Sequence, residues 1–381
     1  MAAEIVPDFV HGYHPGALGI QKGAGYVDQS GELITRWPPG MSTFISPWVV
    51  DDVVESARNL RFVSGFLALG WVVFVAYLMR LLIPRVSILL ALGIAVFWPP
   101  MWAMGDPTRS EMLFTFLSSA GMLALVCLYR RRSSPIFTTV ALTIAAWVAF
   151  AAAALTKTLG IAVALAMFVG IAFGFHSWSI RRRIAVLLLS ASVFAAGLAP
   201  WISAYRDHTG HYGFTSNGLE SVRHGLVRYP HFPLGLELKE RSADWRSYDD
   251  MWTDIRELAA ADRGGAFRLL GIKTVRPWYA TWSGRFDHYL LVVQLPWFLL
   301  FVLASGRTMW RWKQIPGEVI LLHGYVAALW LTAALVAPIL RYLSPAFPFV
   351  VIIVLWHALD ANLLGEKTGE PRELPAEENI R

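Results

Sequence analysis

Apolar runs and short polar connections alternate along this chain from residue 61 to residue 359. Each run has roughly 18 to 22 residues, which is the length that a helix needs to cross the hydrocarbon core of a bilayer. The runs occupy residues 61–80, 86–104, 110–129, 136–155, 158–176, 183–203, 288–305, 317–337 and 342–359. The pattern predicts an all-α polytopic membrane protein with about nine transmembrane helices.

Two of these runs form one apolar block at 136–176, which is interrupted only at Thr156–Gly160. At about 1.5 Å per residue, one helix over the whole block would be about twice as long as the hydrocarbon core is thick. We therefore expect two helices joined by a tight turn.

Basic residues follow every second run, and this regularity predicts the orientation of the chain. The clusters are Arg80 with Arg85, Arg130–Arg132, Arg181–Arg183, and Arg307 with Arg311 and Lys313. Positive charge favours the cytoplasmic side of a plasma or inner membrane. The opposite, external side is then expected to hold residues 1–60, 105–109, Lys157, 204–287 and 338–341.

The same pattern divides the chain into five parts. We expect a first external loop at 1–60, transmembrane helices 1–6 at 61–203, a large external loop at 204–287, transmembrane helices 7–9 at 288–360 and a disordered cytoplasmic tail at 361–381. Within the large loop, the spacing of Met251, Trp252, Ile255 and Leu258 predicts an amphipathic helix. The Trp and Tyr residues of this loop favour packing on the membrane surface or over a site.

Composition supports a membrane protein, because 56% of the residues are hydrophobic and only 16% are charged. The net charge of +6 does not indicate a nucleic-acid partner, since the basic residues lie in short connections where topology explains them. Cys127 is the only cysteine of the chain, so no intrachain disulfide can form.

Five ionisable residues lie on the predicted external side, at the ends of apolar runs or in the adjoining loop. They are Asp8, Asp106, Glu111, Lys157 and Arg341. Charged groups at such depths cost a few kcal/mol unless they are paired or solvated, so they are candidates for a functional site.

Each of these residues also has an ordinary structural interpretation. Asp106 and Glu111 would favour the N-terminus of a helix, and Lys157 could extend its ammonium group to the interface. Arg341 has the same interpretation as an interface residue, although its forked donors also suit a phosphate. Because two cations share one side with the carboxylates, the set favours a site for a lipid-linked phosphate over separate interface residues.

A metal site is a further hypothesis for the first loop. Asp8, His11 and His14 have a spacing that permits metal binding, although two histidines and an aspartate in a loop are more often solvated. The residues permit a divalent ion without requiring one. The chain has no HExxH, GxSxG or GK[ST] motif, so nucleotide-driven chemistry and the common hydrolases have no support.

Four stretches resemble the GT-C superfamily of membrane glycosyltransferases, in particular the dolichyl-phosphate-mannose–protein mannosyltransferase and aminoarabinose transferase-like group. The stretches are Pro7-Asp8 with Tyr13, Gly23–Tyr26 and Arg36–Gly40; Ser110-Glu111; Leu155–Lys157 with Gly160; and Arg341-Tyr342 with Pro345 and Pro348. Their order and their shared side cover most of the chain.

The resemblance implies an inverting glycosyltransferase that takes its sugar from a polyprenyl phosphate on the external side. By analogy, Asp8 would be the general base, Glu111 or Asp106 would position the acceptor or a metal, and Lys157 and Arg341 would hold the donor phosphate. Tyr13, Arg36 and Tyr342 would line the site for a protein, lipid or glycan acceptor.

The sequence departs from the family pattern at three points. The family's first helix, which precedes this loop, is expected to be missing from this version of the chain. Lys157 is followed by Thr158-Leu159-Gly160 where the family usually continues Gly-Pro, and Phe9 follows Asp8 where many members have Glu.

Two other classes of function fit parts of the sequence. A lipid or solute transporter would use charges along a pathway, but it is expected to carry them at mid-membrane depth or in matched broken helices. A scaffold or receptor would use the loop at 204–287 to bind a partner, which leaves Lys157 and Arg341 without a role.

Overall fold

The computed structural model describes residues 5–84, 105–131, 135–226, 233–281 and 284–364, together with residues 89 and 93. Over these residues the chain is built of helices, with one isolated β-bridge between Val27 and Leu33 and no strand. The run expected at 86–104 and the tail after residue 364 lie outside the described residues, apart from residues 89 and 93.

Seven helical segments of the described part are long and apolar enough to cross a membrane. They are α3 (Val53–Leu82), α6 (Glu111–Arg130), α7 (Ile136–Thr156), α9 (Ile180–Thr209), α14 (Asp287–Trp310), α15 (Gly317–Leu335) and the segment Leu340–Leu359, which contains α16 (Leu340–Leu343) and most of α17 (Phe347–Leu364). A shorter apolar helix, α8 (Leu159–Gly174), follows the predicted turn after α7. The expected all-α polytopic membrane protein is confirmed.

Two spanning helices are longer than the apolar runs predict, because polar residues cap them beyond the apolar part. The Asp52 side chain accepts a hydrogen bond from the backbone N–H of Glu55, so α3 begins at Val53 instead of near residue 61. α9 begins after Ser179, whose side chain accepts from Arg182 N, and ends at Gly210 with φ +76°. Each of these helices has 30 residues.

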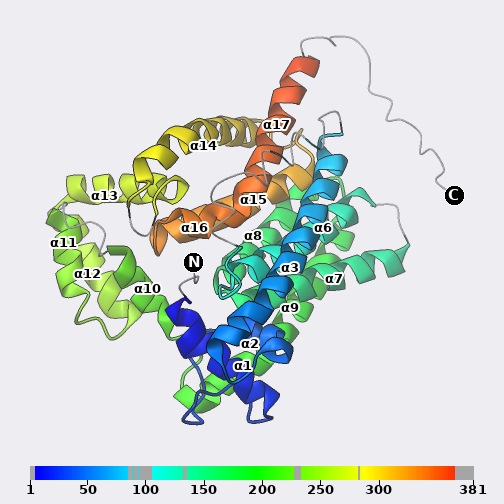
Figure 1. Ribbon diagram of the computed structural model, residues 1–381. Coiled ribbons are helices and arrows are strands. Elements are labelled where there is room, and N and C mark those ends of the chain that lie inside the picture. The colour runs from blue at the N-terminus through cyan, green and yellow to red at the C-terminus, as the bar shows by residue number, and fades with distance from the viewer. Residues whose placement is uncertain are drawn as a thin grey trace.

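The core of the bundle lies between α3, α6, α7, α8, α15 and α17 (Figure 1). Trp147 of α7 stacks on Phe168 of α8 with ring centroids 4.0 Å apart. Ser118 of α6 and Tyr325 of α15 share a buried hydrogen bond of 2.7 Å, which satisfies two polar groups inside the core. These contacts fix α6, α7, α8 and α15, whose ends carry the site.

The N-terminal segment is helical where a loop was expected. It contains the π-helical turn η1 (Phe9–Tyr13), α1 (His14–Gln21), α2 (Gly40–Ile45) and the 3₁₀ turn η2 (Ser46–Trp48). Phe9, Tyr13 and Ala17 follow one another at intervals of four residues, and all three are buried in a small core with Leu60 and Leu113. This helical spacing gives the segment an apolar face, which packs it onto α3 and α6.

The segment between α9 and α14 folds into short helices with a core of their own. These are α10 (Asn217–Leu226), α11 (Pro233–Arg241), α12 (Tyr248–Ala261), α13 (Arg263–Val275) and the 3₁₀ turn η4 (Arg276–Trp278). They group together to one side of α15 and α16 (Figure 1). α12 confirms the predicted amphipathic helix, with Met251 and Leu258 buried and Ile255 partly buried, while Trp252 is exposed.

Two hydrogen bonds fasten this group of helices to α15. Lys273 of α13 donates to the backbone carbonyl of Leu335 at 3.0 Å, and Trp330 of α15 donates its indole N–H to the carbonyl of Thr274 at 2.6 Å. Leu335 is the last residue of α15. The chain then continues through residues 336–339 to Arg341, so these bonds also hold the start of the segment that carries Arg341.

Candidate active site

A cavity of about 190 Å³ opens where the N-terminal segment, the α7–α8 turn, α10, α16 and the ends of α6 and α15 come together. All but one of the charged candidates from the sequence line it. The lining includes Asp8, Tyr13, Arg36, Glu111, Lys157, Arg341 and Tyr342. The fold thus gathers into one space residues that are spread over most of the chain.

An ion triplet forms the charged centre of this cavity. Lys157 Nζ donates to Glu111 Oε1 at 2.8 Å, and Arg341 Nε lies 2.8 Å from the same oxygen. The Glu111 side chain is only 3% exposed, against 14% for Lys157 and 31% for Arg341. Both cations are therefore partly exposed to the cavity, while the carboxylate that contacts both of them is buried.

Lys157 owes its position to the turn between α7 and α8. Its backbone is extended, with φ −152° and ψ 128°, and α8 begins two residues later. A β-carbon at Gly160 would lie 2.5 Å from the backbone of Ala154, so only glycine lets α8 start this close to α7. Burial lowers the pKa of Lys157, and the nearby Glu111 carboxylate acts in the opposite direction.

The Pro38-Pro39-Gly40 stretch packs directly against this turn. A β-carbon at Gly40 would lie 2.6 Å from the carbonyl carbon of Leu155 and 2.7 Å from Thr156 N. Glycine is therefore required where α2 begins, because the two backbones touch. The N-terminal segment and the lysine turn are held together by this contact.

Two tyrosines complete the wall around the ions. The Tyr342 ring lies under both cations, with its centroid 4.8 Å from Lys157 Nζ and 5.3 Å from Arg341 Cζ. Tyr13 donates its hydroxyl to Ser110 Oγ at 3.3 Å. Burial raises the pKa of Tyr13, so its phenol stays neutral and serves as a hydrogen-bond donor.

Asp8 is half-buried at the start of η1, and its side chain lines the same cavity. Its carboxylate does not cap the turn that follows. Over the described residues it has no hydrogen-bond or ion-pair partner, although it interacts at longer range with Lys157 and Arg341. It is the carboxylate of the cavity that remains available to another molecule.

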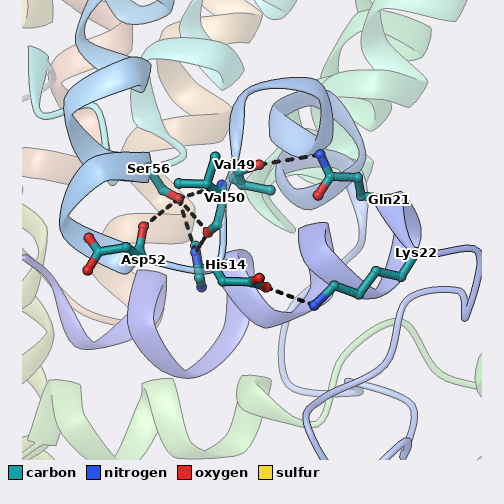
Figure 2. A network of polar contacts seen from close by, with 8 residues as sticks. His14, Gln21, Lys22, Val49, Val50, Asp52 and Ser56 are labelled. Atoms are coloured by element: carbon teal, nitrogen blue, oxygen red, sulfur yellow. Dashed lines mark hydrogen bonds and ion pairs between the residues drawn. The ribbon is translucent and has the colours of Figure 1, made fainter.

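Three other candidates, Asp106, His11 and His14, are not among the residues that line the cavity. Asp106 accepts from Thr108 N and Oγ1 at 3.0 and 2.6 Å and pairs with Arg109 Nε at 2.9 Å, outside the lining of the cavity. Figure 2 shows His14 bonded through Nε2 to the Val50 carbonyl at 2.8 Å and to Ser56 Oγ at 3.2 Å. His11 is exposed.

The structure brings no metal-binding group together in the part of the chain that it describes. There, no three side chains of His, Cys, Asp or Glu lie close enough to hold an ion. Asp8, His11 and His14 do not form such a group, because the hydrogen bonds of His14 hold α1 to the residues before α3.

The cavity also has a polar side that the sequence pattern did not indicate. Its residues belong to the large segment after α9: Thr215, Asn217, Gly218 and Ser221. The N-terminal segment holds them in place, because Ser216 N donates to Thr35 O at 3.0 Å and Arg36 pairs with Glu220 at 2.7 Å. Such polar residues in a long loop carry no sequence signal of their own, since only these long-range contacts direct them to the site.

These features define a class: an integral membrane protein of apolar helices with a charged cavity at one end of the bundle. No protein-family model and no curated protein matches the chain. Two solved structures are similar to it in fold. The chain shares its fold with both of them, which confirms the predicted resemblance at the level of fold.

The first similar structure is ArnT from Cupriavidus metallidurans in the apo state, with a TM-score of 0.55 and 16% identity over 96% of this chain and 58% of that chain. The second is the archaeal oligosaccharyltransferase AglB from Archaeoglobus fulgidus, in complex with an inhibitory peptide and a dolichol-phosphate. Its TM-score is 0.55, with 12% identity over 95% of this chain and 48% of that chain. The chain therefore spans about half the length of each structure.

Proposed function

We propose that this protein is an integral-membrane glycosyltransferase that moves a sugar from a polyprenyl phosphate to an acceptor on the external side of the membrane. The observation that carries the proposal is the cavity itself. It combines two adjacent cations, Lys157 and Arg341, with an unpaired carboxylate, Asp8. A glycosyl phosphate is already activated, so transfer requires no nucleotide.

Lys157 and Arg341 are the proposed ligands of the donor phosphate. Negative charge grows on the phosphate as the bond to the sugar breaks, and fixed cations stabilise this charge in the transition state. Both cations contact Glu111 Oε1. We assign Glu111 the role of holding the two cations side by side, because its buried carboxylate contacts both of them.

Asp8 is the proposed general base. The acceptor oxygen attacks the anomeric carbon, its proton passes to the Asp8 carboxylate, and the anomeric carbon–phosphate oxygen bond breaks with its electron pair leaving on the phosphate. Attack from the side opposite the leaving phosphate inverts the anomeric centre. A base and a phosphate site that line one cavity suit this geometry. None of these steps is assigned to a metal ion.

Three further residues complete the proposed site. Tyr342 supports the two cations from below with its ring. Tyr13 is a neutral hydroxyl donor close to Ser110, and Arg36 lies at the polar side of the cavity. We propose that Tyr13 and Arg36 contact the acceptor and that Tyr342 orders the cations.

The charge pattern supports the proposed external location of the cavity. Lys157 and the N-terminal segment lie at the opposite ends of the helices from Arg130–Arg131 and Arg181–Arg183, which the positive-inside rule assigns to the cytoplasm. The likeness in fold to AglB, whose structure holds a dolichol-phosphate, supports a lipid-linked donor.

The test is transfer from radiolabelled polyprenyl-phosphate sugars to cell-envelope acceptors by the purified protein in proteoliposomes. We expect labelled product with the wild type. Lys157→Ala and Arg341→Ala should each weaken binding of the donor lipid at least tenfold, because each removes one of two phosphate contacts. Donor lipid recovered intact, or moved across the vesicle without transfer, would favour a transporter instead.

A further inference from the structure

Hydrogen bonds between two segments that lie far apart in the sequence hold the polar side of the cavity in place. The hydroxyl of Thr215 donates to the backbone carbonyl of Arg36. The backbone N–H of Ser216 donates to Thr35 O at 3.0 Å, so the residues before α10 run alongside the end of the N-terminal segment. These contacts set the position of Asn217 and Ser221, which line the cavity from the first turns of α10.

Hydrogen-bonding groups on this surface remain available. The side-chain amide of Asn217 has no partner in the part of the chain that the structure describes. Ser221 donates its hydroxyl to the Asn217 carbonyl at 2.8 Å, which leaves the lone pairs of its oxygen free. An amide with two donors and an acceptor, beside hydroxyl oxygens, matches the hydroxyl groups of a sugar.

The charges of the cavity lining and of their ion-pair partners sum to zero. Arg36 pairs with Glu220 at 2.7 Å and Arg109 with Asp106 at 2.9 Å. Lys157 and Arg341 share one carboxylate, Glu111, at 2.8 Å each, so this triplet keeps one positive charge. Asp8 adds one negative charge that no cation of the lining contacts directly.

This balance discriminates between acceptors by their charge. A phosphodiester donor would bring one negative charge to Lys157 and Arg341. A second anion, such as an acceptor phosphate or carboxylate, would then meet Asp8 with no uncommitted cation beside it. Like charges brought together in a partly desolvated site repel each other strongly. An uncharged acceptor meets no such repulsion.

We propose, on the basis of the function proposed above, that the acceptor is a neutral glycan hydroxyl and that Asn217 and Ser221 form its subsite. The α10 segment then determines the acceptor, while the ion triplet determines the donor. The sugar that receives the transfer lies between Asn217 and Asp8, with its reacting hydroxyl toward the Asp8 carboxylate.

The first experiment follows the label from a radiolabelled polyprenyl-phosphate sugar into three competing acceptors. These are mannotriose as a neutral glycan, mannose 6-phosphate as an anionic sugar, and a Ser/Thr-containing peptide. We expect label in mannotriose, with mannose 6-phosphate used at least tenfold less well. Label chiefly in the phosphosugar or in the peptide would overturn the assignment.

Two variants connect the preference to these residues. Asn217→Ala/Ser221→Ala should raise the KM for mannotriose about tenfold with a small change in kcat, because each neutral hydrogen bond contributes roughly a two- to tenfold change in affinity. Glu220→Gln leaves Arg36 without its carboxylate partner. Mannose 6-phosphate should then be used more nearly as well as mannotriose. Ser203→Ala, an exposed residue of α9 outside the cavity lining, is the control and should change neither value.

Binding of the donor lipid separates this inference from the function on which it rests. If the double variant binds donor lipid as the wild type does and keeps the wild-type KM for mannotriose, the acceptor subsite is refuted and the donor site stands. If the wild type neither binds the donor lipid nor transfers its sugar, the glycosyltransferase proposal is refuted, and the acceptor inference with it.

Discussion

The side chains of Lys157 and Arg341 converge on a single oxygen, Glu111 Oε1, at 2.8 Å each. One cation comes from the turn after α7 and the other from the short helix after α15. Two cations this close repel each other unless an anion lies between them, so the Glu111 carboxylate makes their proximity possible. The same proximity is what a phosphate needs from its binding site.

Glu111→Gln should therefore destabilise the protein. Removing one partner of a buried ion pair leaves uncompensated charge, which typically costs about 3–5 kcal/mol, and the partial exposure of Arg341 reduces this to about 2 kcal/mol. Thermal unfolding in detergent measures the change. The double variant Lys157→Met/Glu111→Gln should recover part of the loss, while Glu240→Gln on the exposed surface of α11 should leave the unfolding temperature unchanged. Equal stability of Glu111→Gln and Glu240→Gln would contradict the role of Glu111.

Asp8→Asn should abolish sugar transfer and preserve donor binding. Loss of a general base lowers the rate by about 10²–10⁴-fold, while the donor phosphate keeps both of its cations. Initial rates with saturating donor measure the first effect, and binding of labelled polyprenyl phosphate measures the second. Asp51→Asn is the matched control, because Asp51 pairs with Lys22 on the exposed surface. Undiminished transfer by Asp8→Asn would remove this residue from the mechanism.

Gly40→Ala should displace the lysine turn. The added methyl group would overlap the backbone at Leu155 and Thr156, which cannot yield as a flexible side chain does, and overpacking of this kind costs about 1–3 kcal/mol. We expect lower thermal stability together with weaker donor binding, because Lys157 is the next residue after Thr156. Gly65→Ala in α3 is the control, since no atom lies within 4 Å of a β-carbon there. Wild-type donor affinity in Gly40→Ala would show that the contact does not position Lys157.

Lys273 should make stability depend on pH above neutrality. Burial lowers the pKa of Lys273 to about 8, whereas an unfolded lysine titrates near pH 10.4. Between these values the unfolded state binds more protons, so the free energy of unfolding rises as the pH increases from 8 to 10.4, by about 3 kcal/mol in all. Lys273→Met should flatten this rise when unfolding is followed by Trp fluorescence from pH 7.5 to 10. The same slope in the wild type and in Lys273→Met would refute the assignment.

Residues at the two ends of the bundle should label from opposite sides of the membrane. In a Cys127→Ser background, a cysteine introduced by Gly105→Cys should react with an impermeant maleimide added outside intact cells. One introduced by Arg311→Cys should react only after the cells are opened. Both positions are exposed, so access depends on the membrane alone. Labelling of both from the same side would contradict the orientation and the external site.

The spanning helices and the shared end of Glu111, Lys157 and Arg341 were predictable because each depends on local patterns. An apolar run fixes a helix, and counting crossings fixes the side on which its ends lie. The helical structure of the N-terminal segment was harder to predict from the sequence. Its only signal is the interval of four residues between Phe9, Tyr13 and Ala17, which form its buried face. Asp106 pairs with Thr108 and Arg109 outside the lining of the cavity, and its position near Glu111 in the sequence does not show which way its side chain points.

The polar side of the cavity was not predictable. Asn217 and Ser221 reach it through contacts such as Ser216 with Thr35, which join residues that are far apart in the chain. Local propensity carries no information about such pairs. The α12 helix beside them was found from its periodicity, but periodicity identifies a buried face without naming what covers it.

The 30-residue lengths of α3 and α9 bear on the position of the cavity relative to the membrane. At about 1.5 Å per residue each helix is about 45 Å long, whereas the hydrocarbon core is about 30 Å thick. The residues beyond the apolar runs are 53–60 of α3 and 204–209 of α9 at the cavity end, and 180–182 of α9 at the other end. With the apolar runs of both helices in the hydrocarbon core, the cavity end of the bundle would lie at the level of the lipid headgroups. On the proposed function, a phosphate anchored in the bilayer would reach the cavity from the membrane, and a water-soluble acceptor would reach it from the aqueous side without crossing the hydrocarbon core.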